Sequence, residues 1–187
     1  MAADAALLDR ADRSGEAFLR LYRWDPPCLS LGRNEPATER PVTATVRRPT
    51  GGSSVWHEHE VTYAVAAPLA LFGRLRTAYR AIHERLAEAL RALGVPADIA
   101  PDRRGPSWTV LDRRGPCFAT TVGGEILVRG RKLVGSAQVR RGEAFLQHGS
   151  ILLDGPETEN ATSLRRTLGR VVSFEEVTGA ILAAWLY

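Results

Sequence analysis

The spacing of apolar residues predicts an N-terminal helix followed by a series of short strands. Residues 2–13 carry apolar side chains at helical spacing, whereas residues 18–24 alternate between apolar and polar until Pro26 and Pro27 interrupt them. Other short apolar runs in this half of the chain have the length of strands. The strands predicted in this half are 18–24, 28–31, 42–48 and 55–66.

The clearest helical pattern lies between residues 74 and 93. Apolar side chains recur there at steps of three and four residues, and Gly94 and Pro96 follow as stop signals. A second helix is predicted near the C-terminus, where Ser173 and Glu176 form a capping box. Its predicted apolar face consists of Phe174, Val177, Ile181 and Trp185.

The region between these two helices is rich in strands. Residues 125–128 and 132–134 flank an Arg-Gly-Arg turn, which predicts a hairpin because glycine allows positive φ. Further strands are predicted over 144–147 and 151–153. The stretch 101–116 is rich in arginine, glycine and proline and is predicted to be a loop that becomes ordered on binding.

Length and composition fit one globular domain. The 187 residues suffice for one core and are too few for two comfortable ones, so we expect a single domain over 1–187. Helices that bracket a strand-rich centre with short connections favour the α+β class. We therefore predict a largely antiparallel mixed central β-sheet flanked by helices.

Composition also narrows the cellular setting. Apolar residues make up 44% and charged residues 25%, as in soluble proteins, and no apolar run reaches the roughly 18 residues that span a bilayer. The N-terminus has no secretory signal, and two cysteines cannot form a disulfide framework. We expect a cytoplasmic protein that does not bind membranes.

The net charge is +4, but its distribution argues against nucleic-acid binding. The arginines form scattered pairs instead of a stripe with interleaved aromatic residues. An acidic partner surface fits the same charge. Of the 25 basic residues only Lys132 is a lysine, which suggests a role that a planar guanidinium could not fill.

The segment 47–52, Arg-Arg-Pro-Thr-Gly-Gly, is a candidate ligand loop. Gly51 and Gly52 allow backbone N–H groups to turn towards an anion, and Arg48 adds positive charge. An ordinary β-turn explains an isolated Gly-Gly equally well. The segment is neither a Walker loop nor a dinucleotide fingerprint.

Histidines supply a second set of candidates. On one strand His57 and His59 would share a face, as a metal pair would, but a structural or substrate-facing histidine is the favoured interpretation and no metal site is predicted. His148, followed by Gly149, either orients a reacting group or satisfies backbone groups at a turn.

Cys117 is the candidate nucleophile. It lies at the end of the loop 101–116, and a nearby cation such as Lys132 would lower the pKa of its thiol. The alternative is that Cys117 is a small buried hydrophobic residue. The small residues Gly135 and Ser136 could let a ligand pass close to the backbone or could simply ease strand packing.

Four segments together resemble the biotin/lipoate A/B protein ligase family. They are the N-terminal 23–32, the Arg-Arg-Pro-Thr-Gly-Gly of 47–52 with His57, the Gly-Arg-Lys-Leu-Val-Gly-Ser-Ala-Gln of 130–138, and the Leu-Gln-His-Gly-Ser of 146–150. Cys117 and the sequence that follows it are most similar to the LipM type of octanoyltransferase. The resemblance implies a central sheet with flanking helices, as in biotin ligase catalytic domains.

The resemblance also implies an activity. It implies transfer of an octanoyl or lipoyl group from acyl carrier protein to a lysine of a lipoyl domain, through a thioester on Cys117 that Lys132 steadies. The lipoyl-domain acceptors would be the glycine cleavage H protein or the E2 subunit of a 2-oxoacid dehydrogenase, and no cofactor would be needed. The substrate-binding residues would be Arg48, Gly51, Gly52, His57, Gly135, Ser136, His148 and Gly149.

Two other activities stay open at the level of sequence. One is an ATP-dependent lipoate–protein ligase catalytic domain, for which ATP and Mg²⁺ would be required. The other is a non-catalytic relative that binds acyl groups or lipoyl domains without turnover.

Overall fold

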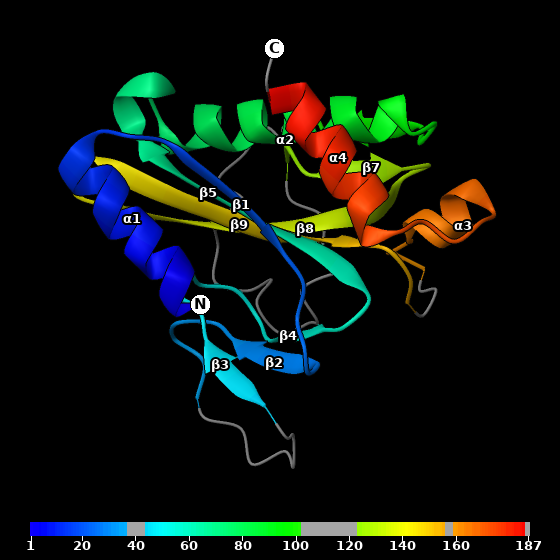
Figure 1. Cartoon of the computed structure of the whole chain (residues 1–187), viewed down its shortest axis with the longest axis horizontal. Coiled ribbons are helices and arrows are strands. Elements are labelled where there is room, and N and C mark those ends of the chain that lie inside the picture. The colour runs from blue at the N-terminus through cyan, green and yellow to red at the C-terminus, as the bar shows by residue number, and fades with distance from the viewer. Residues whose placement is uncertain (37–43, 102–122, 156–158, 186–187) are drawn as a thin grey trace.

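The fold is an antiparallel sheet with helices on its faces and a small second sheet beside it (Figure 1). The structure is a computed structural model, and it describes residues 1–36, 44–101, 123–155 and 159–185. Within those residues, no helix is long and apolar enough to cross a membrane. The helices are α1 (Ala2–Ser14), α2 (Leu75–Ala92), α3 (Leu164–Leu168) and α4 (Phe174–Trp185), with a 3-10 turn at Leu69–Leu71.

The main sheet has six strands in the order β1-β5-β9-β8-β7-β6, and all of its pairings are antiparallel. Its centre is the long pair β5 and β9, in which Tyr63 lies opposite Gly149, and β9 pairs on its other side with β8. The predicted largely antiparallel α+β fold is therefore confirmed. The strands of this sheet are β1 (Phe18–Tyr22), β5 (Glu60–Pro68), β6 (Ala97–Ile99), β7 (Ile126–Val128), β8 (Arg131–Arg141) and β9 (Ala144–Leu152).

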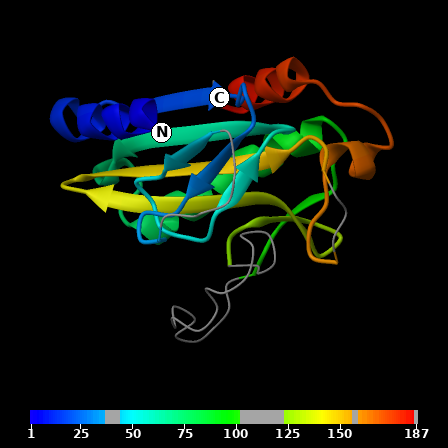
Figure 2. The same ribbon diagram turned by 90° about the horizontal axis from the view of Figure 1, so that it is seen from below.

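The small sheet has the order β3-β2-β4 and is mixed. It contains β2 (Cys28–Leu31), β3 (Thr45–Arg47) and β4 (Val55–His57). β2 runs parallel to β3 and antiparallel to β4. The two views show this sheet lying against the face of the main sheet opposite to α2 (Figures 1 and 2).

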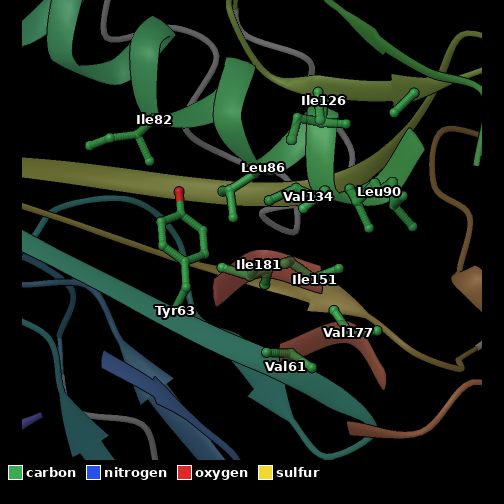
Figure 3. Packing of buried hydrophobic residues seen from close by; sticks show 14 of the residues in the cluster. Val61, Tyr63, Ile82, Leu86, Leu90, Ile126, Val134, Ile151, Val177 and Ile181 are labelled. Carbon is green, nitrogen blue, oxygen red and sulfur yellow. The ribbon is translucent and has the colours of Figure 1, made fainter. Parts of the chain in front are cut away.

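Alternation along the strands gives the two faces of the main sheet different coverings. One face carries Val61, Tyr63 and Ile151 and packs against α2 and α4 in the larger apolar core (Figure 3). The other face carries Ala64, Ala66 and Leu146 at one end, which pack against Leu8 and Ala11 of α1. At its other end this second face carries polar residues, and there the small sheet covers it.

Two strand predictions were wrong in their boundaries. The predicted strand 55–66 is two strands, because the chain leaves the small sheet after His57 and enters the main sheet at Glu60. The predicted strands 144–147 and 151–153 are one strand, β9, which pairs along both edges. Its His148-Gly149 pair is in extended backbone that lies next to β8, not in a turn.

Other predictions were incomplete. The strand expected at 132–134 continues to Arg141 as β8, and the short elements β6 and α3 were not predicted at all. The capping box at α4 is half formed: the Oγ of Ser173 accepts a hydrogen bond from the backbone N–H of Glu176, but the Glu176 carboxylate pairs with Arg170. The predicted strand 42–48 begins outside the described residues and continues as β3 within them.

Candidate functional site

A cavity lies between the small sheet and the polar end of the main sheet. It has a volume of about 350 Å³, with the open space at its mouth included. β4, β5, β8, β9 and the segment after β3 contribute its walls. The residues predicted from the sequence that line it are Arg48, His57, Gly135, Ser136, His148 and Gly149.

Arg48 fixes the shape of the glycine loop beside the cavity. Its buried guanidinium donates from Nη1 to the carbonyl and hydroxyl oxygens of Ser30, at 3.1 and 2.7 Å. From Nη2 it donates to the carbonyls of Gly51 and Ser53, at 3.2 and 2.8 Å. These contacts tie the loop to β2, so the charge of Arg48 is used in holding the loop as well as in facing the cavity.

Gly32 and Gly52 pack against each other at the base of this loop. A Cβ on Gly32 would lie 1.9 Å from the carbonyl oxygen of Gly52, so that only glycine fits there. Gly52 has φ of 95°, a conformation that side chains disfavour. The Glu35 carboxylate joins both segments by accepting from the backbone N–H groups of Gly32 and Ser54, at 2.7 and 2.9 Å.

His57 is held on both ring nitrogens. Its Nε2 lies 2.6 Å from the Oγ of Ser30, and its Nδ1 lies 2.8 Å from Oε1 of Glu60. Its ring stacks on Trp24, with centroids 4.5 Å apart. Because a carboxylate oxygen can only accept, the hydrogen on Nδ1 points to Glu60, while the Ser30 hydroxyl contacts the other ring nitrogen.

Glu60 anchors this relay in the main sheet. Its Oε1 also accepts hydrogen bonds from the hydroxyls of Thr62 and Ser150, and the side chain is buried. A buried carboxylate is tolerated where several donors satisfy it. The chain of bonds from Arg48 through Ser30 and His57 to Glu60 therefore gives the His57 ring a fixed position at the cavity wall.

His148 is oriented by the N-terminal helix. Its Nε2 lies 2.7 Å from the Thr50 hydroxyl, and its Nδ1 lies 3.3 Å from Asp4. Burial lowers the pKa of His148, and Asp4 opposes that shift without reversing it. For Asp4 burial acts upwards, but its hydrogen bonds with His148, Tyr22 and Arg20 outweigh it and lower the pKa of this carboxyl.

Ser136 is held from the opposite face of the sheet. Its Oγ lies 2.7 Å from the Tyr63 hydroxyl and 2.8 Å from Nε2 of His83 on α2. Gln147 donates to the Tyr63 hydroxyl at 2.9 Å. Next to Ser136, a Cβ on Gly149 would lie 2.4 Å from the carbonyl oxygen of Gly135, so glycine is required where β8 and β9 meet at the cavity.

Lys132 forms a buried ion pair. Its Nζ lies 2.6 Å from Oε1 of Glu125, and both side chains are about 97% buried or more. The solitary lysine is therefore an interior group, which agrees with the expectation that a bulkier guanidinium would not replace it. Its expected neighbour Cys117 lies outside the described residues, as do residues 102–116 of the predicted loop.

The structure does not bring His57 and His59 together as a metal pair. His59 is largely exposed, whereas His57 is buried, so the two rings do not form the face that a metal pair would need. Within the described part of the chain, no group of three or more His, Cys, Asp or Glu side chains could hold a metal ion. Cys28 is buried in β2, and this burial raises the pKa of its thiol.

Sequence reasoning missed several residues that shape the site. They are Asp4, Ser30, Glu60, Glu125 and His83. The sequence could have indicated Glu60, since this residue follows the candidate His57 by three positions. Glu125 carried a weaker one, as an acidic residue that directly precedes an apolar strand. Asp4 and His83 lie on helices far away in sequence, and their partners became visible only in the structure.

The site combines an imidazole held on both ring nitrogens with small residues on adjoining strands. Lys132 is not among the residues that line the cavity. Such a site can hold an uncharged chain and a carbonyl group, because backbone and hydroxyl donors lie at its wall and no carboxylate lines it within the described residues. Among those residues it supplies no thiol, since Cys28 is buried in β2 and does not line the cavity.

Comparison with known proteins places this arrangement in context. Residues 1–161 match the family described as the lipoyl protein ligase A/B catalytic domain. The chain is 39% identical to the octanoyltransferase LipM of Kyrpidia tusciae, over 97% of this chain and 79% of that protein. It is 41% identical to the octanoyltransferase LipM of Moorella thermoacetica, over 80% of this chain but only 58% of that protein.

The fold has solved counterparts. A bi-partite lipoate protein ligase from Thermoplasma acidophilum, studied with its E2 lipoyl domain, superposes with a TM-score of 0.70 at 20% identity. The superposition covers 98% of this chain and 75% of that one. At this level of identity the similarity concerns the fold, which it confirms.

Proposed function

Because the chain belongs to the lipoyl protein ligase A/B catalytic domain family, we propose that it is an octanoyltransferase of protein lipoylation. It takes an octanoyl group from acyl carrier protein and transfers it to a lysine of a lipoyl domain. The observation that carries this assignment is the identity of 39% and 41% to two proteins named octanoyltransferase LipM. The ligases with the same fold are more distant in sequence.

The first step forms a thioester on the enzyme. The thiolate of Cys117 attacks the carbonyl carbon of the octanoyl thioester, the new C–S bond forms, and the bond to the sulfur of the carrier's pantetheine arm breaks. The leaving sulfur takes up the proton that Cys117 gave away. One thioester replaces another, so this step is near energetic balance and needs neither ATP nor a metal ion.

The second step forms the amide. The neutral amine of the acceptor lysine attacks the carbonyl carbon of the enzyme thioester, the C–N bond forms, and the bond to Cys117 sulfur breaks. One amine proton ends on that sulfur. An amide is more stable than a thioester, so this step draws the sequence to completion.

Lys132 is proposed to steady both steps. An ammonium has three N–H donors, and Glu125 accepts one of them at 2.6 Å. This contact holds the Lys132 side chain in place, and its proposed role is to favour the Cys117 thiolate and to polarise the carbonyl. A shift of one pKa unit in the thiol corresponds to about 1.4 kcal/mol of stabilisation.

The cavity is proposed to hold the acyl group. Gly135, Ser136 and Gly149 form the wall where β8 and β9 meet, and Arg48 and His57 form the wall beside the glycine loop of Gly51 and Gly52. The backbone donors near Gly135 would face the oxyanion. The preference for acidic partners follows from the net charge of +4, and the cytoplasm is the proposed location.

Mass spectrometry tests the enzyme thioester. After incubation with octanoyl-carrier protein, we expect one octanoyl adduct that hydroxylamine removes. Cys117→Ser should abolish the labile adduct, whereas the control Cys28→Ala should keep it. Transfer from free octanoate with ATP but not from the carrier would show a ligase instead. Binding of octanoate or a lipoyl domain without any turnover would show a non-catalytic relative.

A further inference from the structure

A second cavity, at the far end of β8, is lined by arginines. Its volume is about 540 Å³ with the open space at its mouth included. Among the described residues, the charged ones in its wall are all basic: Arg129 and Arg131 from the β7–β8 hairpin and Arg166 from α3. Thr162 and Thr167 add hydroxyl groups. This combination of several guanidinium groups and hydroxyls suits a phosphate, because arginine binds its oxygens with paired N–H donors.

The hairpin presents its arginine at a backbone position that disfavours it. Arg129 has φ of 50° and Gly130 has φ of 78°, so both central residues of the turn are left-handed. Asparagine and glycine adopt that conformation readily, whereas an arginine there is strained. An arginine at this position gains nothing for the turn itself, so its contribution must come from its side chain.

The arginine cavity is rigidly joined to the strand that carries Lys132. The backbone N–H of Lys132 donates to Asn160 at 2.8 Å, and the N–H of Thr162 donates back to Lys132 at 3.0 Å. Both walls of the cavity are therefore fixed to one residue of β8, and Figure 1 shows α3 beside the hairpin end of the sheet.

We propose that this cavity binds the phosphate of the phosphopantetheine arm through which acyl carrier protein presents its thioester. This inference rests on the proposed octanoyltransferase function and deepens it. The side chains of Arg129, Arg131 and Arg166 are exposed, so a phosphate diester attached to a protein can approach them. No change in the fold is required.

The distances suit such an arm. From Arg131 to Ser136 the strand β8 advances by roughly 16 Å, at about 3.3 Å per residue. The chain between the phosphorus and the sulfur of the arm extends to roughly 16 Å as well, at about 1.2 Å per bond of an extended chain. A phosphate bound at the hairpin end can therefore place its thioester anywhere between Lys132 and the acyl cavity.

Two small thioesters can be used to measure the contribution of the phosphate group to turnover. Octanoyl-phosphopantetheine and octanoyl-pantetheine differ only in that group, so kcat/KM measured with each gives a preference ratio. The wild-type chain should prefer the phosphorylated thioester roughly 10- to 100-fold, mainly through KM, as expected for charge-assisted hydrogen bonds. The triple variant Arg129→Gln, Arg131→Gln, Arg166→Gln should lower that ratio to near one.

A control variant removes the same charge elsewhere. Arg13, Arg76 and Arg80 are exposed on α1 and α2, and their replacement by glutamine should leave the ratio as in the wild type. Equal loss of the ratio in both triple variants, or a wild-type ratio near one, would overturn the phosphate site. Calorimetry with phosphopantetheine itself, compared with pantetheine, gives a readout that needs no turnover.

The two proposals can thus fail separately. A wild-type chain that turns over neither thioester nor octanoyl-carrier protein would overturn the octanoyltransferase function. Binding of phosphopantetheine but not pantetheine, lost only in the cavity variant, would then still support the anion site. Turnover without any dependence on the phosphate would overturn the site and leave the function standing.

Discussion

Two buried histidines lie on opposite faces of the main sheet, and their surroundings differ. His148 lines the acyl cavity, whereas His83 lies on α2 and contacts Ser136 from the other face. His148 has a carboxylate beside it, Asp4, and a hydroxyl on its other nitrogen. His83 has no carboxylate at hydrogen-bond distance: its Nε2 contacts the hydroxyls of Ser136 and Tyr63, and its ring packs edge-on against Tyr79. Burial lowers the pKa of both, to about 3 for His83.

The difference shows two ways of placing polar groups in an interior. On the face of the small sheet, charges are kept and paired, as with Asp4 and Arg20 at 2.6 Å. On the face of α2 the groups that hold Ser136 are neutral, and the nearest charge is the Lys132–Glu125 pair. The Lys132 ammonium adds to the lowering of the pKa of His83. The first arrangement depends on its partners, whereas the second depends on staying uncharged.

The largest effect is expected when the buried Lys132–Glu125 ion pair, whose ammonium acts on His83, is broken. Lys132→Met removes the ammonium and leaves the Glu125 carboxylate in the interior without it. Loss of one partner of a buried pair costs about 3–5 kcal/mol. Urea unfolding at pH 7 measures this as a fall in the free energy of unfolding.

A double variant separates the pair from simple packing. Glu125→Gln in the Lys132→Met background should restore a large part of the lost stability, because no carboxylate then remains to be solvated. A double variant as unstable as the sum of the two single ones would show that the two charges do not interact. Lys132→Met should also raise the pKa of His83, since a cation near the ring is removed.

The second prediction concerns acid stability. Between pH 6.5 and about 3, His83 is protonated in the unfolded chain but stays neutral in the folded chain. The free energy of unfolding therefore falls as the pH is lowered through this range. At pH 4.5 this loss reaches roughly 3 kcal/mol, at about 1.4 kcal/mol per pH unit. His83→Gln places an amide near the position of Nε2 and cannot titrate. Its free energy of unfolding should therefore change much less between pH 7 and pH 4.5.

His59→Gln is the matched control for this measurement. His59 is largely exposed, so its removal should leave the acid slope of the wild type nearly unchanged. If His83→Gln keeps the full slope, the contrast between the two faces is wrong, and His148 or the carboxyl groups must account for acid sensitivity.

Much of this fold could be predicted from the sequence, and the successes have a common cause. The helix 74–93 and the strands 18–24 and 28–31 each pack one or both faces within a single layer, so their apolar period survives in the sequence. Arg48, His57, Gly135, Ser136, His148 and Gly149 line one cavity because the motifs that contain them end on adjoining strands. Their roles in the site stay predictions, and the strand of His148 and Gly149 was taken for a turn.

The remainder depended on partners that are distant in sequence. The predicted strand 55–66 is interrupted where the chain passes from the small sheet to the main sheet. The local sequence does not indicate that Glu60 pairs in a different sheet from His57. The polar centre of β9 resembled a turn because Gln147, His148 and Ser150 find their partners on β5, α1 and the small sheet. Asp4 and His83 contribute through contacts across 144 and 53 positions of the chain, which periodicity does not reveal.

The smallest of the three effects is expected on the charged face. Asp4→Asn keeps an acceptor for Tyr22 but removes the charge opposite Arg20, which costs about 2 kcal/mol at pH 7 for a hydrogen bond to a charged group. It also removes the carboxylate that holds the pKa of His148 up, so that the pKa of this histidine falls further. The stability difference from the wild type should therefore grow once the pH falls below the folded-state pKa of His148 in the wild type, because the folded wild type then binds a proton that the folded variant does not yet bind.

Only below about pH 3.8 should the difference from the wild type shrink, as Asp4 itself takes up a proton in the unfolded and then in the folded chain. Asp9→Asn, at a half-exposed ion pair with Arg141, is the control and should cost less than about 1 kcal/mol at either pH. A folded-state pKa of His148 that is the same in Asp4→Asn as in the wild type, measured by NMR titration, would mean that Asp4 does not support His148. The two histidines would then differ in their hydrogen bonds alone, and the charged face would resist acid no better than the neutral one.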